Sequence, residues 1–399
     1  MGKIKNIKGR QVFDSRGNPT VEAEIFLEDG HYASAIVPSG ASTGTYEAFE
    51  LRDKNNNNYL GRSVFKAIEN IDSQITKALK NVDIADQKKI DKILIDLDGT
   101  EQKKKLGANA ILAVSIAACK LAAIEKNIPL YKNLSILKNF KLPIPLLNII
   151  NGGVHAKNSL DIQEFMIRPD KTNSFVESMQ QSFLVIQNLK GMLSDTNVGD
   201  EGGFAPNLES NEKAIELIIQ AIEKSGFKAG DEISICLDVA ANELKKKKTI
   251  DYFKELIKRF PISSIEDPFP EDDWDSWKML SKSTDIQIVG DDLFATNIKR
   301  LKKGIEEKSA NAILVKLNQI GTITETLKVI ELAQKNGLKT IISHRSGDSE
   351  DTFIADFAVA TNSTQIKTGS LARSERVSKY NRLLRIEEEL GNHAKMAKI

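Results

Sequence analysis

Apolar residues in the second half of the chain gather in short runs that end on residues able to do chemistry. Six such runs are EISICLD to Asp238, ISSIE to Glu266, IQIVGD to Asp291, NAILVK to Lys316, KTIISH to His344 and TQIK to Lys367. Successive end residues lie 28, 25, 25, 28 and 23 positions apart, the length of one strand, one helix and two loops. Such repetition predicts a parallel β/α barrel, whose active site lies where the strands end.

The first 130 residues follow a different pattern. The segments KIKNIKGRQVFD and PTVEAEIFLEDGHYASAIVP alternate as strands do around the turn sequence SRGNP. Helical spacing begins at Ser63, and further helices are predicted at 86–95 and 107–126. We therefore predict an α/β protein with two domains: an N-terminal α+β capping domain (1–130) and an eight-stranded TIM-like β/α barrel (140–399).

The start of the barrel departs from simple βα repetition. The pattern there predicts two strands and then two helices, at 142–153, 161–169, 174–193 and 210–225. The capping domain also holds the loop PSGASTGTYEA (38–48), which is built of small residues without an apolar anchor. Such a loop is either a connector or a lid over a site.

Composition excludes several classes of function. A net charge of +1 gives no electrostatic case for binding nucleic acid or membranes. The apolar stretch 108–124 is interrupted by polar residues and is interpreted as a buried helix rather than a membrane span. The N-terminus lacks the apolar core of a secretory signal, and the two cysteines, Cys119 and Cys236, show no pairing pattern. We expect a cytoplasmic protein with reduced thiols.

Three successive strand ends carry carboxylates. Asp238, Glu266 and Asp291 would present hard oxygen ligands at one barrel mouth, which suits Mg²⁺. The alternative is that each caps the N-terminus of the following helix. Three in succession, each after apolar residues, favour the metal site.

Two lysines reach the same mouth. Lys316 and Lys367 end strands, where a lysine more often extends to solvent. If both point inward, each should depress the pKa of the other, and desolvation should add to the effect, so that one can act as a base. Glu164 and Glu201 could supply a general acid, whereas the glycines around Glu201 could also form a simple turn.

Histidine and arginine complete the candidate set. A lone histidine such as His155 is more often structural, but His344, Arg345 and Ser346 together at a strand end are typical of a phosphate-binding site.

Sequence strings along the whole chain resemble the enolase (phosphopyruvate hydratase) family. Each string is weak alone, but their order is highly specific. They are DSRGNPTVE, PSGASTG, LDGTE, GANAILAVS, NIINGGVHA, DIQEFMI, GDEGGFAPN, SIEDPF, VGDDL, NQIG, SHRSG, IKTG and YNRLLRIEEELG.

The resemblance implies a Mg²⁺-dependent reversible dehydration of 2-phospho-D-glycerate to phosphoenolpyruvate. It implies that Lys316 removes the C2 proton and that Glu201 assists loss of the 3-hydroxyl. It also implies two Mg²⁺ ions: one held by the three strand-end carboxylates, and one held by Ser42 with the substrate phosphate. The positions that resemble substrate-binding residues are His155, Gln163, Glu164, His344, Arg345, Ser346 and Lys367.

The same resemblance implies at least a homodimer, because Arg10, Glu22, Arg385 and Glu388 match positions at the family's dimer contact. The segments 192–198 and 242–253 and the C-terminus are shorter than in most members. Two alternatives remain open: another acid dehydratase or racemase of the enolase superfamily, and a non-catalytic binding protein. A surface or secreted form with binding partners also remains open.

Overall fold

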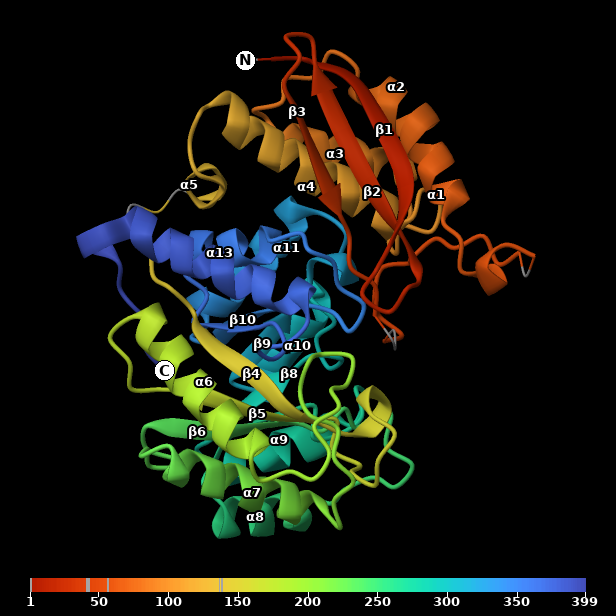
Figure 1. Cartoon of the computed structure of the whole chain (residues 1–399). Helices are drawn as coiled ribbons and strands as arrows, with labels where there is room; N and C mark the ends of the chain where they lie inside the picture. The colour runs from red at the N-terminus through yellow and green to blue at the C-terminus, as the bar shows by residue number, and fades with distance from the viewer. Residues whose placement is uncertain (1, 41–43, 56, 136, 138) are drawn as a thin grey trace.

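The capping domain is a three-stranded antiparallel sheet packed against helices (Figure 1). The computed structural model describes residues 2–40, 44–55, 57–135, 137 and 139–399. The strands are β1 (Ile4–Phe13), β2 (Pro19–Leu27) and β3 (Tyr32–Ile36), with β2 in the centre. The second predicted strand segment is thus two strands, because a turn at 28–31 reverses the chain, with Gly30 at a φ of 93° that favours glycine.

The helices of this domain lie close to the predicted positions. They are η1 (Tyr59–Gly61), α1 (Phe65–Asn70), the π-turn η2 (Ile71–Ile75), α2 (Thr76–Leu79), α3 (Gln87–Asp98), α4 (Ala108–Glu125) and α5 (Leu130–Leu134). By length and composition α4 could cross a membrane, but 83% of it is buried inside the structure. It packs on β2 and β3 on one side and on barrel segments on the other. The helix is therefore apolar on all sides because it is buried between the sheet and the barrel.

The second half of the chain forms a closed eight-stranded barrel, as predicted. Its strands are β4 (Ile144–Asn151), β5 (Glu164–Pro169), β6 (Ile233–Asp238), β7 (Ile262–Glu266), β8 (Gln287–Gly290), β9 (Ala312–Val315), β10 (Lys339–Ser343) and β11 (Gln365–Lys367). The barrel is not wholly parallel, since β5 pairs antiparallel with both β4 and β6. The connection from β4 to β5 contains no long helix, so β5 returns in the opposite direction.

Helices surround the barrel (Figure 1). They are α6 (Phe175–Lys190), α7 (Asn211–Lys224), α8 (Ile250–Arg259), α9 (Trp274–Ser283), α10 (Ile298–Glu307), α11 (Ile323–Lys335), α12 (Phe353–Ala360) and α13 (Ser374–Leu390). Short 3₁₀ turns occur at η3 (Gly153–His155), η4 (Leu317–Gln319) and η5 (Gly391–His393). The order β4, β5, α6, α7 is the strand–strand–helix–helix opening expected from the sequence.

A buried polar contact joins the two domains. Asp91 on α3 accepts hydrogen bonds from Ser115 Oγ on α4 (2.6 Å) and from the backbone N–H of Thr324 on α11 (2.8 Å). The capping domain thereby caps the N-terminus of a barrel helix. Because α11 directly follows the segment that carries Lys316, this contact fixes one wall of the barrel mouth relative to the capping domain.

Candidate active site

The two-residue period of the strands directs the predicted site residues into the barrel. An apolar layer fills the barrel interior and includes Cys236, Val289 and Leu314. Side chains two positions further along a strand point to the same face, so Asp238, Asp291 and Lys316 project inward above that layer. Apolar residues thus form the floor of the site, and ionisable residues form its mouth.

The antiparallel direction of β5 brings Glu164 to the same mouth. Glu164 begins β5, and its register partners are Asn151 on β4 and Asp238 on β6. In the next pair Asp238 lies beside Glu266 on β7. Three carboxylates from adjacent strands therefore occupy one level of the barrel.

Lys367 contacts all three of these carboxyl groups. Its Nζ lies 2.9 Å from Glu164 Oε2, 2.9 Å from Asp238 Oδ2 and 2.9 Å from Glu266 Oε2, and the side chain is 3% exposed. Burial and the neighbouring Asp238 charge raise the pKa of Glu266 well above its usual value. Burial would lower the pKa of Lys367, but the carboxylates outweigh it and raise that pKa well above its usual value.

Lys316 forms an ion pair with Asp291. The other oxygen of Asp291 accepts a hydrogen bond from Gln319 Nε2 (3.0 Å). Burial opposes the charged form of Lys316, and so does the charge of Lys367, but Asp291 outweighs both and the pKa of Lys316 is raised. The predicted effects of Lys367 and of desolvation on Lys316 are thus present, but the net lowering of the pKa that they were expected to produce is not found, because the adjacent carboxylate outweighs them.

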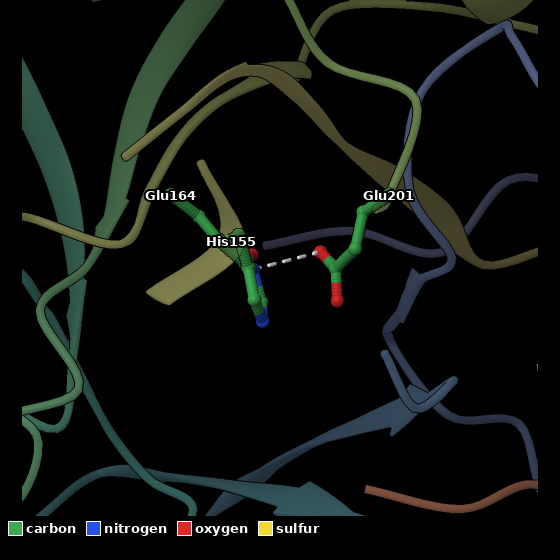
Figure 2. A group of neighbouring side chains, drawn as sticks. All are labelled: His155, Glu164 and Glu201. Carbon is green, nitrogen blue, oxygen red and sulfur yellow. Dashed lines mark ion pairs between the residues drawn. The ribbon is translucent and has the colours of Figure 1, made fainter. Parts of the chain in front are cut away.

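A second cluster joins two acids and two histidines. Glu201 Oε1 lies 3.3 Å from His344 Nε2, and Glu201 Oε2 accepts a hydrogen bond from Asn148 Nδ2 (3.1 Å). His155 Nδ1 lies 3.7 Å from Glu164 and 3.8 Å from Glu201, so its ring stands between the two carboxyl groups (Figure 2). All four side chains are buried.

The two acids of this cluster have opposite pKa shifts. Burial and the charge of Glu201 raise the pKa of Glu164 well above its usual value. Burial acts the same way on Glu201, but the facing histidines and the nearby Arg376 guanidinium hold its pKa well below that value. Burial lowers the pKa of His344 to about 4, so its ring is neutral at pH 7. The surroundings therefore favour the protonated form of Glu164 and the ionised form of Glu201.

One cavity is lined by all the described residues of the predicted site except Glu266. The empty space in this region, including the part that is open to solvent, is about 530 Å³. The predicted residues that line it are His155, Gln163, Glu164, Glu201, Asp238, Asp291, Lys316, His344, Arg345, Ser346 and Lys367, and Glu266 contacts it through Lys367. Ser42 lies outside the described residues.

The loop that contains Ser42 is anchored beside this cavity. The N–H and C=O of Ser39 exchange hydrogen bonds with the backbone of Gly347 at 2.7 and 2.9 Å. Glu47, near the end of the loop, accepts a hydrogen bond from Arg345 Nη1 at 2.9 Å. The loop therefore starts and ends against the segment that carries the predicted phosphate-binding residues.

The carboxylates fit a divalent cation. A single cationic atom, Lys367 Nζ, already contacts Asp238 and Glu266 together, so their oxygens converge on one point. None of the three strand-end acids caps a helix, because the N-caps of α8, α9 and α10 are Thr249, Asp273 and Asn297. The capping alternative is therefore excluded for these helices. Hard oxygen donors in this arrangement suit a divalent metal.

The predicted trio is not itself a compact ligand group in this structure. Among the described residues, the groups whose ligand atoms lie within 4.8 Å of one another are His155 with Glu164 and Glu201, and Asp267 with Asp291 and Asp292. Within the trio, Lys367 contacts Asp238 and Glu266, whereas Asp291 pairs with Lys316.

Sequence reasoning missed some residues of the mouth. Asp267 accepts hydrogen bonds from the backbone N–H groups of Asp291 (2.9 Å) and Asp292 (2.8 Å) and so orients the end of β8. Burial, with the charge of Asp291, raises the pKa of Asp292 to about 7. A signal was present, because Asp267 and Asp292 each directly follow a predicted ligand. For Glu47, in the capping domain, the sequence offers no comparable signal.

Comparisons with known proteins cover the whole chain. The family model described as "Enolase, N-terminal domain" matches residues 4–134, and "Enolase, C-terminal TIM barrel domain" matches residues 139–251 and 242–399. The chain is also 61% identical to "Enolase" from Pelagibacter ubique (strain HTCC1062) over 418 aligned positions, covering 100% of both chains. The two parts of the barrel match overlap at 242–251, within the segment predicted to be short. With its capping domain, its barrel and its cavity of converging acids and lysines, the chain belongs to the enolase family.

Proposed function

We propose that the residues of this cavity carry out the enolase reaction, the reversible dehydration of 2-phospho-D-glycerate to phosphoenolpyruvate, with Lys316 as the base and Glu201 as the acid. The observation that supports these roles is the separation of the site into two clusters. One cluster pairs Lys316 with a carboxylate, and the other places Glu201 near Glu164, whose pKa is raised well above its usual value. Proton removal and proton donation are thereby assigned to different side chains.

Lys316 is the proposed base at C2. Burial and the charges of Arg345 and Lys367 oppose its ammonium form, whereas Asp291 favours it. Lys316 can therefore lose its proton and act as a base at neutral pH only when Asp291 binds another partner. The proton at C2 is weakly acidic because its removal adds charge beside a carboxylate, so the resulting enolate needs cationic neighbours, of which Lys367 is one.

Magnesium is the proposed metal. Asp238, Glu266 and Asp291 would hold one Mg²⁺ and Ser42, with the substrate phosphate, a second, and these ions would stabilise the negative charge of the enolate. Loss of activity in excess chelator and its return with Mg²⁺ would support this assignment. Full activity in chelator would contradict it.

Glu201 is the proposed acid for loss of the 3-hydroxyl. Its surroundings favour the ionised form, whereas those of Glu164 favour the protonated form, so we assign a shared proton to Glu164. We propose that this proton passes to Glu201 when the anionic substrate enters, because added negative charge raises the pKa of the nearer carboxyl. His155 and Asn148 hold the two carboxyls in place for that transfer.

The remaining residues bind the substrate. Arg345 and Ser346 suit the phosphate, since a guanidinium fork matches phosphate oxygens. His155 and Gln163 line the cavity on the side of the acid pair and suit the hydroxyl end. A related enzyme for non-phosphorylated acids would not need Arg345, and a purely structural protein would not need the buried lysines. Both alternatives are therefore disfavoured.

The experiment that tests the roles separates two measured rates. Lys316→Ala should abolish both phosphoenolpyruvate formation and exchange of the C2 hydrogen with D₂O. Glu201→Gln should lose dehydration, by roughly 10²–10⁴-fold for a lost general acid, while exchange persists. If the Glu201 variant binds substrate but exchanges no C2 hydrogen, the assignment of roles is wrong.

We also propose that the chain forms at least a homodimer and acts in the cytoplasm. Large apolar side chains are exposed beside β1: Phe13, Tyr59, Leu60 and Phe65, with Leu60 83% exposed. Arg10 on β1 pairs with Glu22 (2.5 Å), while Arg385 and Glu388 are exposed on α13. Apolar surface of this kind beside charged residues is typical of a protein interface.

A further inference from the structure

A buried arginine on α13 lies behind the acid cluster. The side chain of Arg376 has no exposed surface, and its guanidinium extends under the segments 199–203 and 344–346. Its stem passes close to Gly369, where an added Cβ would lie 2.9 Å from Arg376 Cδ and 2.5 Å from Glu201 O. Glycine at 369 thus leaves room for the arginine beneath the loop that carries Glu201.

The guanidinium contacts one imidazole nitrogen and several carbonyl oxygens. Arg376 Nη1 lies 2.6 Å from His344 Nδ1 and donates to Arg345 O at 2.7 Å. Arg376 Nη2 donates to Ser346 O at 2.7 Å and to Asp200 O at 3.1 Å. The nearest carboxylate is that of Glu375, 3.4 Å from Arg376 Nε. The arginine therefore connects the two loops that present His344 and Glu201.

These contacts determine which nitrogen of His344 carries the proton. Arginine is only a donor, so His344 Nδ1 must accept, and the single proton of the neutral ring then lies on Nε2. His344 Nε2 faces Glu201 Oε1 at 3.3 Å. The nitrogen of His344 that carries the proton thus lies beside the carboxyl proposed as the acid.

We propose that Arg376 is a positioning residue for dehydration, which acts by fixing the Nε2–H tautomer of His344 and thereby holding Glu201 in place. This inference rests on the proposed role of Glu201. Without the guanidinium, His344 Nδ1 loses the donor that keeps it unprotonated. The ring proton can then move to Nδ1, which leaves the unshared electron pair of Nε2 facing Glu201.

The test compares Arg376→Met with Arg382→Met. Arg382 lies on the same helix and pairs with Asp356 at 2.7 Å, away from both loops, so its loss reports destabilisation alone. Arg376→Met should slow dehydration roughly 10–100-fold, as expected for loss of an orienting partner. Exchange of the C2 hydrogen should change by less than about threefold, since Lys316 is untouched. Arg382→Met should leave the ratio of the two rates unchanged.

A spectroscopic measurement distinguishes positioning from general support of the fold. The chain has four histidines, so ¹⁵N-histidine labelling can assign the ring of His344 and report its tautomer. The wild type should show Nε2–H, and Arg376→Met should show Nδ1–H or a mixture. If Arg376→Met does not fold, Arg376→Lys is tested instead, because lysine keeps the charge but lacks the planar guanidinium. It should change the rate ratio and the tautomer of His344 in the same direction as expected for Arg376→Met.

The inference is overturned if the foldable Arg376 variant keeps the Nε2–H tautomer, or if dehydration and exchange fall equally. Glu201→Gln serves as the reference. Full dehydration by Glu201→Gln would reject the proposed acid itself. If the ratio of exchange to dehydration increases in Glu201→Gln and does not increase in the Arg376 variant, only the role of Arg376 is rejected.

Discussion

Replacing Lys367 by methionine should make the stability of the protein depend on a divalent cation. The substitution keeps most of the volume of the side chain but leaves Glu164, Asp238 and Glu266 without the cation that each contacts at 2.9 Å. Removal of one partner from a buried ion pair costs about 3–5 kcal/mol. We expect the free energy of unfolding in excess chelator to fall by about that amount.

The loss should not reach the sum of the separate contacts. Hydrogen bonds to charged groups contribute about 1.5–3 kcal/mol each, and three would exceed the predicted loss. The carboxyls can bind protons instead, because the pKa values of Glu164 and Glu266 are already raised well above their usual range. In the variant the folded state should bind more protons than the unfolded state, so its stability in chelator should decrease as pH rises from about 5 to 8.

Urea unfolding with and without Mg²⁺ measures the effect. A cation that binds only the folded protein adds about 2.7 kcal/mol at a concentration 100 times its dissociation constant. The gain should be larger for Lys367→Met than for the wild type, because Lys367 competes with the cation for Asp238 and Glu266.

Lys379→Met is the matched control. Lys379 is equally buried but contacts only one carboxylate, Asp348, at 2.7 Å. It should lose stability while its gain from Mg²⁺ matches that of the wild type. Equal unfolding midpoints for Lys367→Met and the wild type in chelator would refute the reasoning, and so would equal gains from Mg²⁺.

Three further predictions concern acid stability, the loop and assembly. The pKa of His344 is lowered from 6.5 to about 4, so the unfolded state binds the extra proton first. Stability should therefore fall as pH drops from about 6.5 to 4, by roughly 3 kcal/mol from this group, and His344→Gln should show a smaller fall in urea titrations at each pH. Ser42→Ala should reduce turnover across a Mg²⁺ titration without shifting the unfolding midpoint. Unchanged kinetics would show that the loop takes no part in the reaction. The wild type should sediment as a dimer at micromolar concentration, and Leu60→Asp should weaken this dimer. A monomeric wild type would contradict the proposed assembly.

The sequence alone determined the architecture and the content of the barrel mouth. Apolar runs at a constant spacing require strands that alternate with helices, and a two-residue period sets which strand-end side chains share a face. Asp238, Asp291, Lys316 and Lys367 could therefore be placed in one mouth from their positions in the runs. The order of short motifs then indicated the family.

Tertiary structure decided the direction of β5 and the charge state of the site. The direction depends on a connection without a long helix, which brings Glu164 to the mouth from the start of its strand rather than from its end. Protonation depends on burial and on charges that arrive from distant parts of the chain. Lys316 was expected to have a low pKa, but Asp291 raises it. Arg376 gave no signal at all, because an arginine in an amphipathic helix cannot be distinguished from a surface residue until the loops that it supports are folded over it.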